Sequence, residues 1–129
     1  MSKPLERILY VEDDPDIQAI ALMVLDSISG FTVEPCSSGS EALEKAEAFG
    51  PDLILLDVMM PGMDGPETLR ALRQFPSLQP VPVVFMTAKV QPQEVREYLN
   101  LGASGVIAKP FDPMTLSQQL IDIWAHARQ

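Results

Sequence analysis

The sequence has little of several residue types on which common protein classes depend. It contains one cysteine, Cys36, and one histidine, His126, among 129 residues. A lone cysteine cannot form an internal disulfide, which fits a reducing cytoplasm, and a lone histidine excludes a metal site built from clustered histidines. No apolar run approaches the ~18 residues of a membrane-spanning helix, and the first residues lack the pattern of a signal peptide. We therefore expect a cytoplasmic protein with no membrane partner.

Basic residues are scarce in the first half of the chain. Residues 1–64 hold 13 acidic and 3 basic residues, a net charge of −10, whereas residues 65–129 hold 5 acidic and 6 basic residues, a net charge of +1. The whole chain carries −9. This charge repels nucleic acids and anionic lipid surfaces, so no direct nucleic-acid partner is expected.

The chain does hold a regular alternation of short apolar runs and segments with helical periodicity. One segment has apolar residues at positions i, i+3, i+4, i+7, i+8 and i+11, which predicts a helix with a core-facing stripe of Ile17, Ile20, Ala21, Val24, Leu25 and Ile28. The apolar runs predict strands over residues 8–11, 31–33, 53–56, 81–86 and 106–108. A helix is expected after each strand, the fourth over residues 92–101 and the last from 113 to about 127.

Five strand–helix units in succession predict a single α/β domain over residues 1–129, with a core from about 7 to 126. Because parallel crossovers are right-handed, few topologies remain. We expect a doubly wound, five-stranded parallel sheet of the flavodoxin-like (βα)5 type, with strand order 2-1-3-4-5. In such a sheet a ligand crevice lies at the carboxyl ends of strands 1 and 3, where the strand order reverses.

Polar side chains follow the predicted strands at this edge. Glu12 and Asp13 follow the first strand, Asp57 the third, Thr87 the fourth and Lys109 the fifth. Carboxylates brought together repel one another, and a bound Mg²⁺, which prefers oxygen ligands and a phosphate oxygen, removes that conflict. Lys109 adds a positive charge and Thr87 a hydroxyl donor. The pattern predicts a Mg²⁺ site beside Asp57, whose carboxylate can act as a nucleophile and form an aspartyl phosphate.

The chain resembles the receiver (phosphoacceptor) domain of two-component response regulators. The resemblance rests on four motifs in order and at the right spacings, ILYVEDDPDI, PDLILLDVMMPGMDG, VPVVFMTA and GASGVIAKPFDP, and covers about residues 7–126. It implies that Asp57 is phosphorylated. It also implies that Asp13 ligates Mg²⁺, that Glu12 acts largely through water, and that the backbone carbonyl of Met59 is a further ligand.

The same resemblance implies how the phosphoryl group is held and used. Thr87 would move to hydrogen-bond it, Lys109 would pair with it, and the Lys109–Pro110 bond would be cis. The donor would be a sensor histidine kinase, a histidine phosphotransfer protein or a small acyl phosphate. The domain would then catalyse only its own phosphorylation and dephosphorylation, and would signal by binding a downstream protein or by relaying the phosphate.

Two features concern the signal and its partners. The family usually has an aromatic residue three positions before the lysine. This chain has Val106 there, which has no ring that could turn inward and couple the site to the face of the fourth helix, fifth strand and fifth helix. That face is also where a dimer would form. Leu22 and Met23 extend the apolar stripe of the first helix and are candidates for docking the phosphodonor. No output module follows the last helix, so we expect a stand-alone receiver.

Two alternatives stay open at this point. One is a Mg²⁺-dependent phosphohydrolase with Asp57 as nucleophile. Haloacid-dehalogenase-like enzymes work in this way, but they need a second aspartate two residues later, where this chain has Met59. The other is a receiver-like scaffold that is never phosphorylated. The presence of all the acidic, hydroxyl and lysine residues argues against the scaffold.

Overall fold

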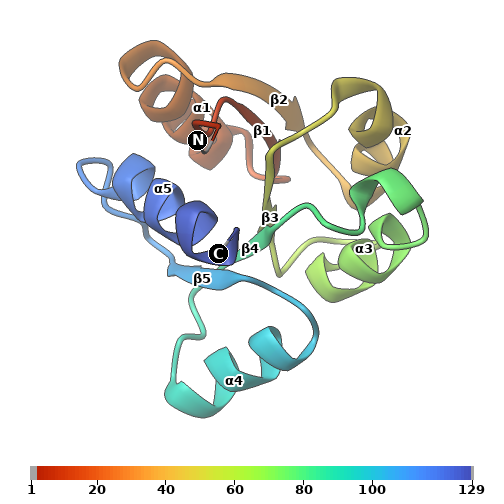
Figure 1. Cartoon of the computed structure of the whole chain (residues 1–129). Helices are drawn as coiled ribbons and strands as arrows, with labels where there is room; N and C mark the ends of the chain where they lie inside the picture. Colours follow the sequence, from red (N-terminus) through yellow and green to blue (C-terminus); the bar gives the residue numbers. More distant parts are fainter. Residues whose placement is uncertain (1–2, 129) are drawn as a thin grey trace.

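The computed structural model describes residues 3–128. Five parallel strands form one sheet in the order β2-β1-β3-β4-β5, which confirms the predicted topology (Figure 1). The strands are β1 (Arg7–Val11), β2 (Thr32–Cys36), β3 (Leu53–Asp57), β4 (Val83–Thr87) and β5 (Gly105–Ala108). The helices are α1 (Pro15–Leu22), its π-helical continuation η1 (Met23–Ile28), α2 (Gly39–Phe49), α3 (Gly65–Leu72), the short 3-10 helix η2 (Pro76–Leu78), α4 (Pro92–Asn100) and α5 (Leu116–Ala127).

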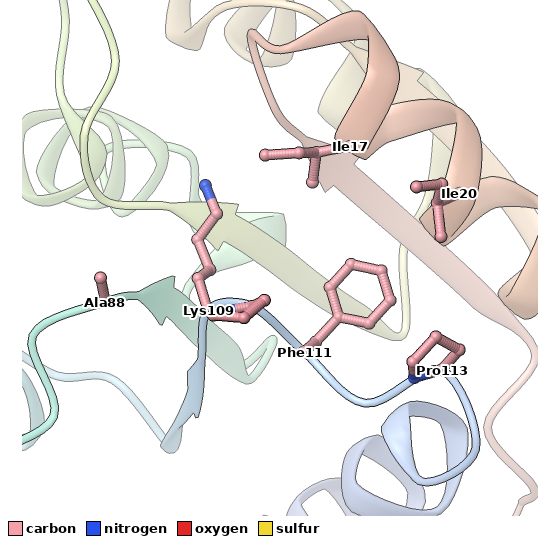
Figure 2. A pocket seen from close by; sticks show the side chains of 7 residues that line it. Ile17, Ile20, Ala88, Lys109, Phe111 and Pro113 are labelled. Atoms are coloured by element: carbon pink, nitrogen blue, oxygen red, sulfur yellow. The ribbon is translucent and has the colours of Figure 1, made fainter.

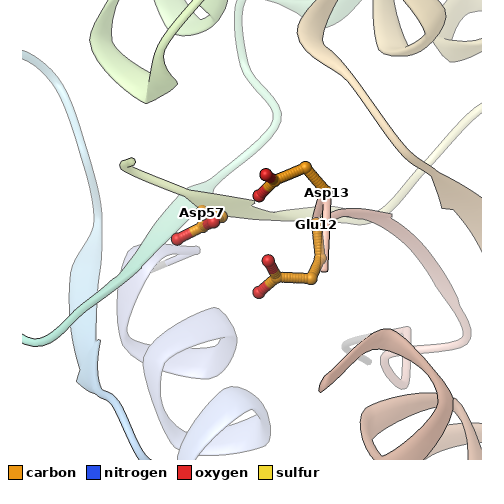
Figure 3. A group of neighbouring side chains, drawn as sticks. All are labelled: Glu12, Asp13 and Asp57. Carbon is orange, nitrogen blue, oxygen red and sulfur yellow. The ribbon is translucent and has the colours of Figure 1, made fainter. Parts of the chain in front are cut away.

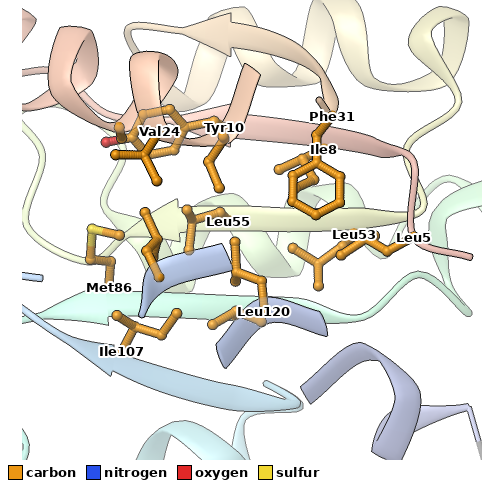
Figure 4. Close-up of a cluster of buried hydrophobic side chains, with 14 of the residues drawn as sticks. Leu5, Ile8, Tyr10, Val24, Phe31, Leu53, Leu55, Met86, Ile107 and Leu120 are labelled. Carbon is orange, nitrogen blue, oxygen red and sulfur yellow. The ribbon is translucent and has the colours of Figure 1, made fainter. Parts of the chain in front are cut away.

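Helices cover both faces of the sheet and make two hydrophobic cores. On one face, side chains of α1, η1 and α5 pack on alternate residues of the strands, among them Ile8 and Tyr10 (Figure 4). On the other face, α2 and α3 pack on the intervening residues, among them Leu9 and Val11. Every residue of β3 and β4 is buried, as expected of central strands enclosed on both sides.

The register of the strands brings their carboxyl ends to one edge of the sheet. Val11 of β1 is level with Cys36 of β2 and Leu56 of β3, and Thr87 of β4 is level with Ala108 of β5. Because all the strands are parallel, the residues that end or follow them gather at this edge. The strand ends predicted to form the site therefore lie at one edge of the sheet.

The first helix departs from the predicted stripe. Ala21, Val24 and Leu25 are buried, but Ile20 is 46% exposed and Ile28 is 74% exposed. The chain winds as a π-helix from Met23 onward, and a π-helix turns each residue through a smaller angle than an α-helix does. The prediction that Ile20 and Ile28 face the core was therefore wrong. At Ile28 the π-helical winding breaks the α-helical period of the stripe, whereas Ile20 precedes that segment in α1 and lies outside the hydrophobic core.

Element boundaries also differ from the prediction, most of all at the end of β2 and the start of α5. Strand β2 runs on to Cys36 and includes Pro35, which is tolerated because β2 is an edge strand. Helix α5 begins at Leu116 rather than at residue 113. The intervening turn is closed by Asp112, whose carboxylate accepts a hydrogen bond from the Met114 N–H at 2.9 Å. No helix within residues 3–128 is long and apolar enough to cross a membrane.

Candidate functional site

Four polar residues are held at the carboxyl edge of the sheet by the strands that precede them. Glu12 follows β1, Asp57 ends β3, Thr87 ends β4 and Lys109 follows β5. Glu12 is 1% exposed, and Asp57 and Thr87 are 2% exposed each. An ionised group is costly to bury unless it has a partner, so carboxylates at this depth call for a cation.

Lys109 is the cation that the chain itself supplies. Its Nζ donates to Oε1 of Glu12 at 3.1 Å and to Oδ1 of Asp57 at 3.0 Å. Its main chain is fixed as well, since the Lys109 N–H donates to the Thr87 carbonyl at 2.9 Å. The Lys109–Pro110 peptide bond is cis, as predicted. One ammonium group therefore connects two carboxylates that come from different strands.

The electrostatics show that one lysine does not balance the site. Burial raises the pKa of Glu12 to about 7, although the Asp14 N–H and Lys109 both hydrogen-bond its carboxylate. Burial by itself would lower the pKa of Lys109, but its hydrogen bonds to Asp57 and Glu12 outweigh that effect and raise it. Lys109 is therefore charged at neutral pH, and the carboxyl groups gathered at this edge outnumber it.

The third carboxylate comes from Asp13. One oxygen from each of Glu12, Asp13 and Asp57 lies within 4.8 Å of the other two, and Asp13 is the least buried of the three (Figure 3). All-oxygen donors with excess negative charge suit a hard divalent cation such as Mg²⁺. The residues present therefore fit the expected metal. The side chain of Met59 is 67% exposed, and the role of its carbonyl oxygen stays a prediction.

Thr87 presents its hydroxyl at the same edge. Its Oγ1 accepts a hydrogen bond from the Lys89 N–H at 3.1 Å, at the start of the loop that leads to α4. A hydroxyl that accepts one hydrogen bond keeps its own hydrogen for a second partner. Thr87 therefore keeps a donor hydrogen at the edge of the sheet where Asp57 ends β3.

An apolar groove of about 460 Å³ opens beside Lys109. Figure 2 shows Ile17 and Ile20 of α1 opposite Phe111 and Pro113 of the loop between β5 and α5. Sequence reasoning did not assign Ile20, Phe111 or Pro113 to the site. Phe111 and Pro113 lie close to Lys109 in the sequence, and that closeness was the available signal.

The structure gives less support to the other residues singled out on the first helix. Leu22 is partly buried and Met23 is 54% exposed, and neither lines the groove. Val106 is partly buried on the edge strand β5. On the neighbouring β4, Phe85 packs edge-to-face against Tyr98 of α4, with ring centroids 5.3 Å apart. The aromatic contact in this region therefore involves α4 rather than β5.

Comparison with known proteins gives consistent results. Residues 8–121 match the response regulator receiver domain family. Among curated proteins, the chain is 40% identical over 111 residues to the DNA-binding response regulator MtrA of Mycolicibacterium smegmatis, covering 86% of this chain and 47% of that protein. It is 38% identical over 115 residues to the alkaline phosphatase synthesis transcriptional regulatory protein PhoP of Bacillus subtilis, covering 89% and 47%. The chain thus spans about half the length of these relatives.

Solved structures agree with the sequence comparison. The chemotaxis protein CheY4 of Vibrio cholerae has a TM-score of 0.86 and 33% identity, covering 92% of this chain and 98% of that one. The signal receiver domain of a signal transduction histidine kinase from Syntrophus aciditrophicus has a TM-score of 0.80 and 32% identity, covering 94% and 91%. At these identities the likeness extends beyond the bare fold.

Proposed function

The chain belongs to the response regulator receiver domain family, and on that basis we propose that it stores a signal as a phosphoryl group on Asp57. The observation that carries this proposal is the environment of one carboxylate. Asp57 is buried at the end of β3, hydrogen-bonded to Lys109 at 3.0 Å, and within 4.8 Å of oxygens of Glu12 and Asp13. It thus combines a nucleophile, a counter-charge and a metal-binding cluster.

The proposed reaction is an in-line transfer to a carboxylate oxygen of Asp57. An electron pair of that oxygen forms a bond to phosphorus while the bond from phosphorus to the donor, a phosphohistidine nitrogen or an acyl phosphate oxygen, breaks and its electrons leave with the donor. Lys109 pairs with one phosphoryl oxygen and Thr87 donates its hydroxyl to another. Mg²⁺ held by Asp13 and Asp57, by Glu12 largely through water, and by the Met59 carbonyl would neutralise phosphoryl charge.

The later steps belong to the same proposal. Hydrolysis of the aspartyl phosphate, aided by the same residues, would reset the domain, and no other substrate is turned over. The signal would pass through phosphorylation-dependent binding of a downstream protein or through relay of the phosphate. A dimer would use the face formed by α4, β5 and α5. A cytoplasmic location is proposed on the same grounds, and the single buried Cys36 is compatible with a reducing compartment.

We propose that the groove beside Lys109 receives the phosphodonor, a histidine kinase or a histidine phosphotransfer protein. Its walls are apolar and it opens next to the Lys109 side chain, whose ammonium group reaches Asp57. A partner that packs apolar side chains between Ile20 and Phe111 would bring its phosphohistidine close to the carboxyl edge of the sheet. The residues that dock the donor are therefore expected on α1 and on the loop after β5.

One experiment tests the proposed function against both alternatives. The protein is incubated with Mg²⁺ and acetyl phosphate, and its intact mass is measured for the wild type and for Asp57→Asn. We expect a gain of one phosphoryl group in the wild type and none in the variant. No gain in either would favour the unphosphorylated scaffold, and rapid turnover of added phosphomonoesters would favour the phosphohydrolase.

A further inference from the structure

A glutamine on α1 connects the ends of two strands behind the acidic cluster. The side-chain Nε2 of Gln18 donates to the carbonyl of Glu12 at 3.0 Å and to the carbonyl of Cys36 at 3.2 Å. A side-chain amide has two N–H groups, so both donors are used. The carbonyls belong to the residue after β1 and to the last residue of β2.

These hydrogen bonds fix the main chain of Glu12 on both sides. Its N–H donates to the Cys36 carbonyl at 2.9 Å, and its own carbonyl accepts from Gln18. The two contacts lie one residue beyond the end of β1. Gln18 thus extends the order of the sheet to the residue immediately before Asp13.

Gln18 is itself held in place by the capped first turn of α1. Its N–H donates to the Asp14 carbonyl at 2.9 Å in the first turn of α1. Asp14 caps the same helix, because its carboxylate accepts from the Asp16 and Ile17 N–H groups at 2.9 and 3.2 Å. A side chain that starts from a capped helix can hold its acceptors in place better than one from a mobile loop can.

We propose that Gln18 is a positioning residue for the metal site, acting through the backbone of Glu12 and Asp13. Mg²⁺ requires near-ideal octahedral geometry with ligands at about 2.0–2.1 Å, so small displacements of its carboxylates weaken binding. Residues that hold metal ligands in place typically account for about 10–100-fold in affinity. This inference rests on the proposed Mg²⁺ site of Glu12, Asp13 and Asp57.

The test is calorimetric titration of the metal-free protein with MgCl₂. In Gln18→Met the side chain keeps a similar length but loses both donors. We expect its Mg²⁺ Kd to rise about tenfold. Gln93→Met on α4 is the matched control. Gln93 is exposed, and its side chain hydrogen-bonds only the side chain of Gln91 among the residues described, so the Mg²⁺ Kd of this variant should equal that of the wild type. The melting temperature of each variant in EDTA reports folding separately.

Several outcomes would overturn the inference. If Gln18→Met melts earlier but binds Mg²⁺ as the wild type does, Gln18 is merely structural. If Gln93→Met loses as much affinity, the effect is not specific to the site. If Gln18→Met does not fold, Gln18→Asn, whose amide is one methylene shorter, takes its place, and an unchanged Kd there has the same meaning. Failure of the wild type to bind Mg²⁺ would instead reject the proposed metal site and the inference with it.

Discussion

The ammonium nitrogen of Lys109 lies 3.0 Å from Oδ1 of Asp57, although 52 positions separate the two residues in the sequence. The same nitrogen bonds Glu12, so one flexible side chain is held between two buried carboxylates. An aspartyl phosphate at Asp57 would carry more negative charge than the free carboxylate does. Lys109 is therefore already placed to respond to that change.

Replacing Lys109 should slow phosphorylation much more than it affects the fold. Lys109→Met keeps the aliphatic stem and removes the charge that would pair with the phosphoryl group. We expect phosphorylation by acetyl phosphate to slow by about 100-fold, comparable to the loss of one charge-stabilising donor in an enzyme. Intact mass against time gives the rate. Lys89→Met, two residues after Thr87 on an exposed loop, should stay within about twofold of the wild type, and an equal loss there would contradict a specific role for Lys109.

The stability of the metal-free protein should depend on pH through Glu12. The pKa of Glu12 in the folded protein, about 7, exceeds the ordinary carboxyl value, so the folded state binds more protons than the unfolded chain between these two values. Stability in EDTA should therefore fall as pH rises from about 5 to 8. Glu12→Gln, which mimics the protonated form, should flatten this slope in thermal melts, whereas Glu44→Gln on the exposed side of α2 should keep it. An unchanged slope in Glu12→Gln would show that another group is responsible.

Mg²⁺ should oppose this pH dependence. Binding requires the carboxylates in their charged form, so protons compete with the metal below the raised pKa of Glu12. The rise in melting temperature caused by Mg²⁺ should therefore grow as pH increases from about 5 to 8. A Mg²⁺ effect that is constant over this range would argue against a site that includes Glu12.

A charge placed in the groove should separate docking from chemistry. Ile20→Asp should slow phosphotransfer from a histidine kinase that phosphorylates the wild type by at least about tenfold, since an unpaired charge opposes apolar contact. Phosphorylation by acetyl phosphate should not change. Ile28→Asp is the matched control, because Ile28 is a more exposed isoleucine outside the groove. If Ile20→Asp also lost reactivity with acetyl phosphate, the groove would not be acting as a docking site.

Tyr98 should determine how firmly α4 is attached. No residue of α4 is fully buried, and Tyr98 is its one side chain that packs against the hydrophobic core within the described residues. Tyr98→Ala should lower the free energy of unfolding by about 1–2 kcal/mol, including the edge-to-face contact with Phe85. Amide exchange in α4 should accelerate more than in α2. Leu99→Ala, at an exposed neighbouring residue, should neither lower the free energy of unfolding nor accelerate amide exchange in α4. Similar amide exchange in the two variants would contradict this account of α4.

The residues of the site could be predicted from the sequence, because the apolar run that marks each strand can be recognised from neighbouring residues alone. Each of Glu12, Asp57, Thr87 and Lys109 ends or follows an apolar run, and parallel strands in a doubly wound sheet bring such positions to one edge. Their convergence therefore followed from pattern and topology. The electrostatics of the site could not be predicted in this way, because the raised pKa of Glu12 depends on the burial of its side chain in the folded protein.

The sequence by itself thus determined the strand order, the acidic edge and the choice of Asp57 as the candidate phosphoacceptor. Tertiary structure decided what one helical period could not, namely that Ile20 faces a groove with Phe111 while Ile28 faces solvent. It also decided that Gln18 reaches the carbonyl of Cys36, 18 positions away. Contacts of this kind depend on how whole helices and strands pack against one another. The positions of these elements are fixed only in the folded chain, by helix winding and side-chain packing.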